Sequence, residues 1–402
     1  AYRELQLQGV LKGCPGKGVY VDSPFPAHSR LQVSWSSRLR EKEIVRLREQ
    51  FQEAEPQCEL NEIEAGGDVV GLPVDLAPTW AADLQDITQE ALALYGRGER
   101  GAAAFDCLRW QGRLLMLPVD WQSVAVLLNQ DIFEREGVPL PGADWDQNEM
   151  LDLARRLNRP ERGYHGISIC KGAGVADSFL SLIWQNGGSV FDATGTRCLL
   201  AEPEAVAAAQ VMRRFRDYAT PANRDTEARW GSNIADFAKG RAAMIFANSW
   251  EYVEANPSDA RFRLAVRPMP RGRYRASYFS AWGLGVRRGA RLDGPVRTLL
   301  KLLAGIEKWP DYLPKHPPIP LFQDLEADSE AFRVYSDAKD RGRTFLADIE
   351  PACRTKLHSM LLPLVEGTLA QILRDETPVD QLLSSLRDHA NRMMEKPRHP
   401  RS

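Results

Sequence analysis

The sequence lacks the patterns that several large functional classes need. It has no run of about 18 apolar residues, which argues against a membrane-spanning helix. Its six cysteines and six histidines form no CxxC, HxxxH or HxH pair, so we expect no metal site. It also has no GxSxG nucleophile motif and no glycine-rich loop ending in Gly-Lys-Ser/Thr. We therefore expect neither a cofactor nor enzymatic activity.

The sequence also has no excess of either charge, because its 402 residues include 52 Lys and Arg and 54 Asp and Glu. This balance argues against a surface that coats nucleic acid or anionic lipid, although a small basic module is compatible with it. The length suggests two or three domains. Scattered cysteines are typical of free thiols in a reducing compartment. The first residues show no basic segment followed by an apolar core, as a signal peptide would, although a mature cleaved chain would look the same. We expect a cytoplasmic protein.

The first 21 residues predict the end of a helix followed by a hairpin. Apolar residues at helical spacing stop at Gly9, a suitable C-cap, and two short apolar strands flank a turn at residues 15–18. The patterns A-x-R-E-L-x-x-x-G and P-G-K-G-x-x-V make residues 1–21 similar to the recognition-helix end and wing of a GntR-type winged-helix domain. The resemblance implies DNA contacts by Arg3, Lys12 and Lys17. The alternative is an ordinary surface hairpin.

The following segment predicts a layered sheet. Residues 22–30 contain two prolines and no periodicity, so we expect a linker. Residues 31–35, 58–63 and 68–72 have the pattern of strands, and residues 39–51 have the apolar spacing of an amphipathic helix. Strands that alternate with helices predict an α/β fold with parallel strands. Ligands of such sheets bind at the carboxyl ends of the strands.

Residues 31–396 resemble a carbohydrate-type extracellular solute-binding protein of ABC transporters, similar to the maltodextrin-binding proteins. The segments that carry the resemblance are residues 68–88, 110–138, 179–192, 200–212, 237–252, 267–272 and 280–290, among them WQGRLLMLPVDWQSVAVLLNQDIFEREGV and FAKGRAAMIFANSWEY.

This resemblance implies the two-lobe periplasmic-binding-protein-like α/β fold of type II, with three hinge crossovers near residues 118–122, 264–268 and 310–318. We expect the first lobe to comprise residues 31–119 and 267–312, and the second lobe residues 120–266 and 313–396. Residues 397–402 read as a tail. The family usually has a helix and loop before the strand at 68–72, whereas only residues 64–67 intervene here. The cleft should therefore be more open on that side, which puts the size of the ligand in doubt.

Tryptophans beside turns and strand ends make a carbohydrate ligand the chemical expectation. An indole ring covers the apolar face of a sugar, while carboxylates and amides bind its hydroxyls. The resemblance places the candidate ligand-binding residues in the interlobe cleft: Trp35, Ser36, Asp75, Asp120, Trp121, Trp184, Trp230, Asn248, Trp250 and Trp282. The alternative for each tryptophan is core packing, and for each aspartate a turn or cap.

We interpret the chain as the sugar-sensing domain of a GntR-type transcriptional regulator. A monosaccharide or oligosaccharide would close the lobes and change binding to operator DNA, with a homodimer as the expected assembly. The alternative is a secreted ABC-transporter receptor that delivers sugar to a permease. A carbohydrate-active enzyme is a third class, but the sequence cannot identify the two placed carboxylates that it would need.

Overall fold

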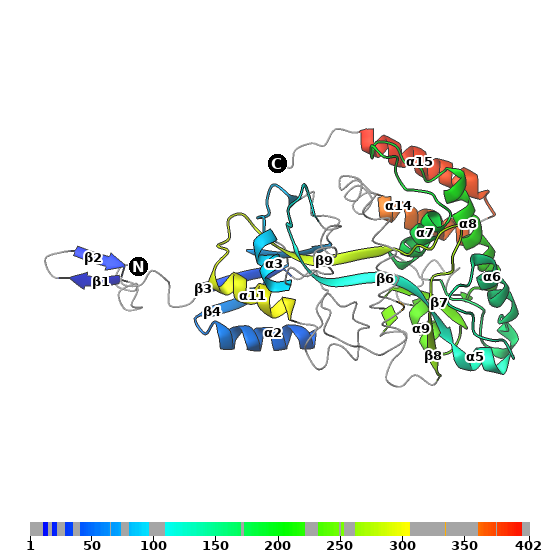
Figure 1. Ribbon diagram of the computed structural model, residues 1–402, viewed down its shortest axis with the longest axis horizontal. Coiled ribbons are helices and arrows are strands. Elements are labelled where there is room, and N and C mark those ends of the chain that lie inside the picture. The colour runs from blue at the N-terminus through cyan, green and yellow to red at the C-terminus, as the bar shows by residue number, and fades with distance from the viewer. Residues whose placement is uncertain are drawn as a thin grey trace. The chain divides into compact units, whose positions relative to one another are not determined.

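The computed structural model describes residues 11–14, 18–21, 29–34, 41–64, 66–73, 80–95, 109–169, 173–221, 232–248, 251–252, 262–305, 334, 361–374 and 376–395. The chain divides into two compact units (Figure 1). The first consists of Ala1–Gly98, Arg109–Val119 and Trp282–Ile306. The second consists of Glu99–Leu108, Asp120–Ala281 and Glu307–Ser402. Each unit is therefore built from segments that lie far apart in the sequence.

The first unit contains a mixed sheet with the strand order β4-β3-β5-β9. Its strands are β3 (Ser29–Ser34), β4 (Cys58–Glu62), β5 (Val69–Pro73) and β9 (Phe279–Val286). β3 pairs in parallel with β4 and β5, and β5 pairs antiparallel with β9. The strands that the sequence predicts at 31–35, 58–63 and 68–72 are present, so the parallel α/β prediction is confirmed here.

Helices complete the core of the first unit. They are α2 (Glu41–Ala54), α3 (Thr88–Tyr95) and α11 (Gly294–Ala304). α11 packs against both α2 and α3. Leu47 and Phe51 on α2 are fully buried, as the spacing of apolar residues between 39 and 51 predicts. Burial of one face against the rest of the unit is what stabilises so charged a helix.

The link between β4 and β5, residues 63–68, crosses β3 without a helix. Gly67 has a φ of +90°, and a Cβ on it would lie 2.7 Å from the carbonyl oxygen of Gln32. Only glycine fits so close to the backbone of β3 in this conformation. Asp68 fixes the end of the link, since its N–H donates to Gln32 O (2.8 Å) and its carboxylate accepts from Gln32 N–H (3.0 Å). The described part of the link thus forms a tight backbone crossing beside Gln32.

The described part of the second unit contains three strands and a set of helical segments. The strands are β6 (Leu117–Asn129), β7 (Met244–Asn248) and β8 (Leu264–Pro268). β6 pairs antiparallel with both of the others. The helical segments are α5 (Gln130–Arg135), α6 (Gln147–Arg156), η2 (Pro160–Arg162), α7 (Ala173–Gln185), α8 (Pro203–Phe215), η3 (Arg216–Tyr218), α9 (Ser232–Ala238), α14 (Leu362–Arg374) and α15 (Val379–Glu395).

Distant segments meet in the second unit's core. α14 packs against α7, α8 and α15, so residues beyond 361 return to helices formed before residue 216 (Figure 1). The core includes the fully buried Phe179, Phe215 and Phe246, and the last two rings meet edge to face at 6.0 Å. Cys198 is buried here as a free thiol, and Cys58 is a buried free thiol of the first unit. Burial raises the pKa of the Cys198 thiol.

Two of the passages between the units lie within described strands. β6 enters the second unit at 119/120, inside the predicted crossing at 118–122. The return occurs at 281/282 within β9, whereas the sequence places it near 264–268. Residues 264–268 differ from that expectation because β8 pairs along Ala125–Asn129 of β6 inside the second unit. The expected third crossing at 310–318 lies outside the described residues, as does the tail at 397–402.

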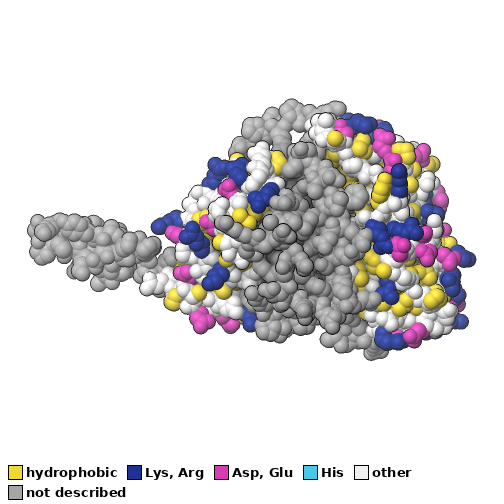
Figure 2. All heavy atoms as spheres, in the orientation of Figure 1, with side chains coloured by type: hydrophobic (Ala, Val, Ile, Leu, Met, Phe, Trp, Pro, Cys, Tyr) yellow, Lys and Arg dark blue, Asp and Glu magenta, His cyan; other side chains and the backbone are white. Residues whose placement is uncertain are grey.

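The predicted N-terminal hairpin is present as β1 (Leu11–Cys14) and β2 (Gly18–Val21), an antiparallel pair. Arg3 and Lys17 lie outside the described residues, and of Lys12 only the backbone is described. Among the described helices, none is long and apolar enough to cross a membrane. On the face seen in Figure 2, Lys and Arg side chains are interspersed with Asp and Glu over the second unit.

Candidate functional site

The carboxyl ends of β3 and β5 lie beside the return crossing of the first unit. Pro73, the last residue of β5, pairs with Trp282, where β9 enters this unit. β3 runs parallel to β5, so Ser34 marks the same edge, and its side chain is buried. We call this the crossing edge of the first unit. The predicted ligand residues Trp35, Ser36 and Asp75 follow these strands in the sequence and lie outside the described residues.

Trp282 is the one predicted ligand residue of the first unit whose side chain is described. A Cβ on Gly71 would lie 2.1 Å from Cζ2 of Trp282 and 3.0 Å from Ser34 O. The indole therefore occupies the space that glycine leaves beside β5. Trp282 is 2% exposed, so in this structure its ring packs on the sheet.

The second unit has an edge of its own where β7 ends. Asn248, the last residue of β7, pairs with Val124 on β6, close to the point where β6 enters the unit. Asn248 Oδ1 accepts a hydrogen bond from Glu251 N–H (3.0 Å), and the Glu251 carboxylate accepts one from Asn248 N–H (2.9 Å). This reciprocal pair is the capping-box arrangement. It links the two residues that flank Ser249 and Trp250, which lie outside the described residues.

A second buried network attaches the segment before β9 to α7 and β6. Ser277 Oγ donates to Val124 O (2.7 Å) and accepts from Val124 N–H (3.2 Å). Ser181 Oγ on α7 accepts from Tyr278 N–H (2.7 Å), and Gln185 Nε2 donates to Ala276 O (2.8 Å). Each satisfied buried polar group restricts the backbone beside it. The start of the return crossing is therefore held in one position on the second unit.

The remaining predicted residues have different environments. Trp184 is 1% exposed and stacks on Tyr278 with ring centroids 6.2 Å apart, so its ring packs in the core of the second unit. Asp120 and Trp121 lie on β6 at the crossing, where only their backbone is described, and Trp230 lies outside the described residues. The structure thus brings Asp120, Trp121 and Asn248 to one edge of the second unit.

Several residues of these edges are missing from the sequence prediction. Ser181, Gln185 and Ser277 act through pairings between segments about 90 to 150 residues apart, and no local pattern indicates them. Glu251 does have a signal, since Asn248 followed three residues later by a glutamate is a capping-box pattern. The described residues contain no group of three or more His, Cys, Asp and Glu that could hold a metal.

Residues 62–307 match the family model described as bacterial extracellular solute-binding protein. The chain belongs to this family. Solute-binding proteins of this family are non-enzymatic carriers, in agreement with the expectation that the chain is not an enzyme. The matched residues begin at 62, so the similarity of residues 1–21 to a GntR wing stays a prediction.

Solved structures of solute-binding proteins share the fold of this family member. The GacH receptor of Streptomyces glaucescens is 18% identical over 92% of this chain and 100% of that chain, with a TM-score of 0.71. A Thermotoga lettingae protein is 14% identical over 91% of this chain and 100% of that chain, with a TM-score of 0.72. A Listeria monocytogenes substrate-binding protein is 17% identical over 91% of this chain and 99% of that chain, with a TM-score of 0.68. These similarities confirm the predicted two-lobe fold. No curated protein sequence gives a match.

Proposed function

We propose that the chain binds a carbohydrate or sugar alcohol as the receptor of an ABC transport system. The observation that carries this proposal is the family match over residues 62–307 together with the ligands of similar structures. The GacH receptor is in complex with acarbose, the Thermotoga lettingae protein with α-D-tagatose and the Listeria protein with cycloalternan. An Agrobacterium vitis protein with the same fold holds D-mannitol. All four ligands are polyhydroxyl compounds.

In this proposal the ligand is bound by residues at or near the strand ends described above for each unit, together with Trp230. Trp35, Trp121, Trp230 and Trp250 cover apolar sugar faces, and Asp75 and Asp120 accept hydrogen bonds from hydroxyls. Asn248 supports the turn that carries Trp250 through its pair with Glu251. Trp282 shapes the edge by packing on Gly71. A receptor of this kind works outside the cytoplasm and hands its ligand to a permease.

A second candidate keeps the same ligand but changes its use. The hairpin of β1 and β2, with the P-G-K-G sequence at its turn, supports a sensor attached to a GntR-type DNA-binding domain. Such a sensor is cytoplasmic, binds operator DNA as a homodimer, and couples ligand binding to a change in DNA affinity. Fractionation of the native cells distinguishes the two, since a transport receptor is found outside the cytoplasm and a sensor inside. The DNA affinity of the native protein, measured with and without sugar, is the second test.

Titration of tryptophan fluorescence with a panel of neutral sugars and sugar alcohols tests the ligand class. We expect a saturable change with at least one compound. Trp250→Phe should weaken that response, whereas the matched change Trp110→Phe, at a half-buried tryptophan of the first unit, should leave the affinity unchanged. Absence of a response to every neutral polyhydroxyl compound would refute the proposal.

A further inference from the structure

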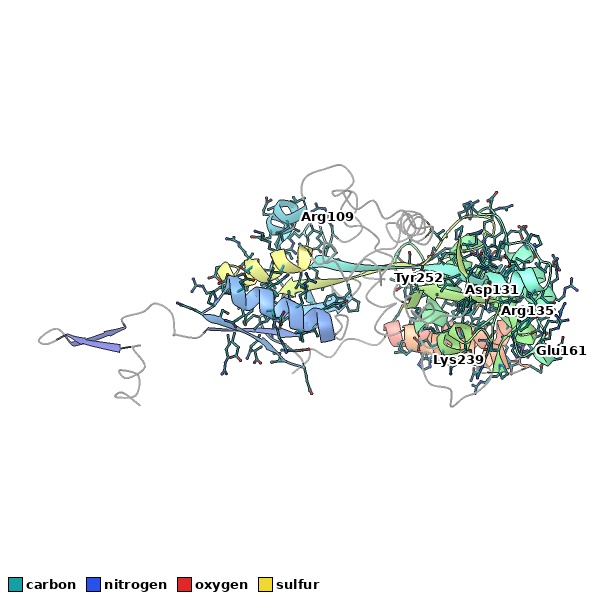
Figure 3. The ribbon with its side chains drawn as sticks, turned by 90° about the horizontal axis from the view of Figure 1, so that it is seen from below. Arg109, Asp131, Arg135, Glu161, Lys239 and Tyr252 are labelled. Atoms are coloured by element: carbon teal, nitrogen blue, oxygen red, sulfur yellow. The ribbon has the colours of Figure 1, made fainter. Side chains whose placement is uncertain are left out.

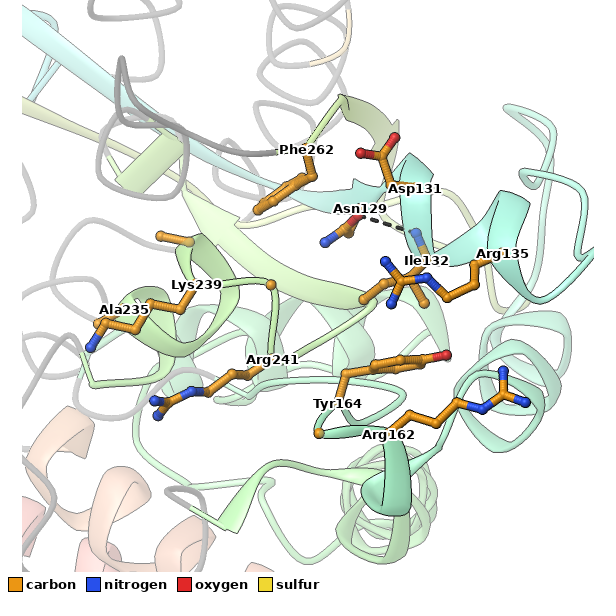
Figure 4. A pocket seen from close by; sticks show the side chains of 13 residues that line it. Asn129, Asp131, Ile132, Arg135, Arg162, Tyr164, Ala235, Lys239, Arg241 and Phe262 are labelled. Atoms are coloured by element: carbon orange, nitrogen blue, oxygen red, sulfur yellow. Dashed lines mark hydrogen bonds between the residues drawn. The ribbon is translucent and has the colours of Figure 1, made fainter.

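The second unit has a pocket at the end of β6 that lies opposite to the crossing. The pocket has a volume of about 810 Å³, and its walls come from the end of β6, α5, residues 162–164, the end of α9 and Phe262 (Figure 4). The run of β6 from Asp120 to Asn129 spans about 30 Å at about 3.3 Å per residue. In Figure 3, Tyr252 lies toward the crossing end, and Asp131 and Arg135 lie toward the other end. The pocket is therefore separate from the crossing edge.

The charge of this pocket is mainly positive. The charged side chains that line it are Arg135, Arg162, Lys239, Arg241 and Asp131. Three of them have partners within the unit, in the ion pairs Arg162–Glu136 (2.6 Å), Arg241–Asp236 (3.2 Å) and Asp131–Arg263 (2.9 Å). Arg135 and Lys239 form no ion pair with any carboxylate that the structure describes. Two cations thus remain available to an anionic ligand.

Asn129 adds a buried donor to the same pocket. Its side-chain oxygen accepts a hydrogen bond from Ile132 N–H (3.3 Å) and caps α5. Its amide nitrogen is consequently turned the other way, into the pocket (Figure 4). Asn129 is 2% exposed, and that nitrogen forms no hydrogen bond with any described residue. That nitrogen is not among the described buried side-chain atoms that lack a partner, so it is open to the pocket, where an acceptor can reach it.

The position of Arg135 is set by its surroundings. Its guanidinium lies over the ring of Tyr164 at 5.6 Å from the centroid, and both face the pocket. Tyr164 in turn donates its hydroxyl proton to Glu136, a carboxylate that is also paired with Arg159 at 3.1 Å. The hydrogen bond from Tyr164, with the charges of Arg162 and Arg159, holds the pKa of Glu136 below its usual value. Glu136 is thus paired with Tyr164, Arg159 and Arg162, and it forms no ion pair with Arg135.

We propose that this pocket binds a phosphorylated metabolite, with the phosphate held by Arg135 and the amide of Asn129, which lie side by side in Figure 4. Arginine is a usual phosphate-binding side chain, an amide N–H group donates to a second oxygen, and Lys239 adds positive charge on the other side of the pocket. The volume exceeds that of inorganic phosphate and falls in the range of pockets for small organic molecules. The phosphate ester of a sugar therefore fits both the charge and the size. The site goes beyond the proposed function, because it lies apart from the edges that bind the neutral sugar.

Isothermal titration calorimetry on the full chain tests this proposal with glucose 6-phosphate, inorganic phosphate and glucose. We expect one saturable site for glucose 6-phosphate, weakened by increasing salt. Arg135→Gln should weaken it about tenfold or more, since it removes a charged donor to the phosphate, and Lys239→Gln should weaken it less, since it removes only a nearby positive charge. Asn129→Asp keeps a capping oxygen for α5 but replaces the donor with a carboxylate, so it should abolish binding while leaving the thermal midpoint nearly unchanged.

Lys301→Gln is the matched control, because Lys301 is an exposed lysine on α11 of the first unit. Binding of inorganic phosphate with equal affinity would assign the site to the free anion, and binding of the ester alone would assign it to the metabolite. The proposal is overturned if neither phosphate compound binds, or if Lys301→Gln weakens binding as much as Arg135→Gln. The fluorescence response to neutral sugars should persist in all these variants. If the unmodified protein shows no such response, the proposed function is wrong, and the proposal for this pocket is not affected.

Discussion

The crossing edge of the first unit is held by shape, and that of the second by buried hydrogen bonds. In the first unit, Trp282 fills the space above Gly71. In the second, Asn248 and Glu251 bind each other, and Ser277 binds both backbone groups of Val124. Of the twelve buried polar or charged side chains described, Ser34 belongs to the first unit and the other eleven to the second. The two ends of the crossing strands therefore respond differently to mutation.

This difference teaches which edge tolerates substitution. Apolar packing accepts changes that preserve volume, because no single geometry is required. A hydrogen-bonded network requires each partner, because a buried polar group left alone costs free energy. We expect the first unit to be sensitive to side-chain size at its edge and the second to be sensitive to side-chain chemistry.

The largest effect should come from the separate cores. Phe246→Ala removes a fully buried ring that meets Phe215, and it should cost the second unit about 3–5 kcal/mol. Phe51→Ala should act in the same way on the first unit. Differential scanning calorimetry should show each variant lowering a different transition, with Val45→Ala, an exposed position on α2, as the neutral control. If both variants lowered the midpoint of one shared transition, the prediction that the two units unfold separately would be wrong.

Next in size is a steric change at the edge of the first unit. Gly71→Ala places a Cβ 2.1 Å from the ring of Trp282, so the indole must move, at a cost of about 1–3 kcal/mol. Urea unfolding followed by fluorescence measures it. Gly142→Ala is the control, because a Cβ there meets no atom within 4 Å. An unchanged midpoint for Gly71→Ala would show that the edge is loosely packed.

A smaller effect is expected from polar chemistry at the edge of the second unit. Asn248→Ala removes one half of the pair with Glu251 and should cost about 1 kcal/mol. Asn248→Ser keeps an oxygen for the cap and should cost only a few tenths of a kcal/mol. Sugar affinity separates two roles for this residue. If Asn248→Ser folds normally and still loses affinity, Asn248 contacts the ligand directly rather than through the turn.

The smallest expected effect is a pH dependence within the second unit. The pKa of Glu136 is lowered in the folded protein, first by the hydrogen bond from Tyr164 and then by Arg162 and Arg159. Its stabilisation is therefore complete above the unfolded pKa of about 4.3 and is lost as pH falls through the lower folded value. Above that pH range, the free energy of unfolding of Glu136→Gln should be lower than that of the wild type by a constant amount. In acid, the two free energies of unfolding should become equal. A constant offset down to the lowest pH would contradict this assignment.

Local patterns predicted much of the first unit. The strands at 31–35, 58–63 and 68–72, the helix face of Leu47 and Phe51, and the hairpin of β1 and β2 all follow from spacing within a few residues. The crossing near 120 was also found, because the resemblance covers that segment. The return crossing lies at 281/282 rather than near 264–268. Residues 264–268 would form a strand in either case, and only the pairing of β8 with β6 shows that they belong to the second unit.

The candidate sites show the same limit more clearly. A tryptophan at a strand end is compatible with a ligand contact and with packing, and only the position of Gly71 reveals what Trp282 touches. The basic pocket joins residues from 129 to 262, none of which forms a local motif. Charges without a partner can be recognised only after the ion pairs of their neighbours are known. Long-range geometry, rather than residue type, is what the sequence leaves undetermined.

The pairing of β5 has a consequence for biosynthesis. Among the described residues, β5 pairs with β3 at Val69 and Val70, and its ladder with β9 extends from Val69 to Pro73. While the ribosome is still synthesising residues before 282, the edge of β5 that awaits β9 is a strand without its neighbour. Such unpaired edges promote association between nascent chains. This edge of β5 therefore stays open to other strands until residues 282–286 of β9 have been translated.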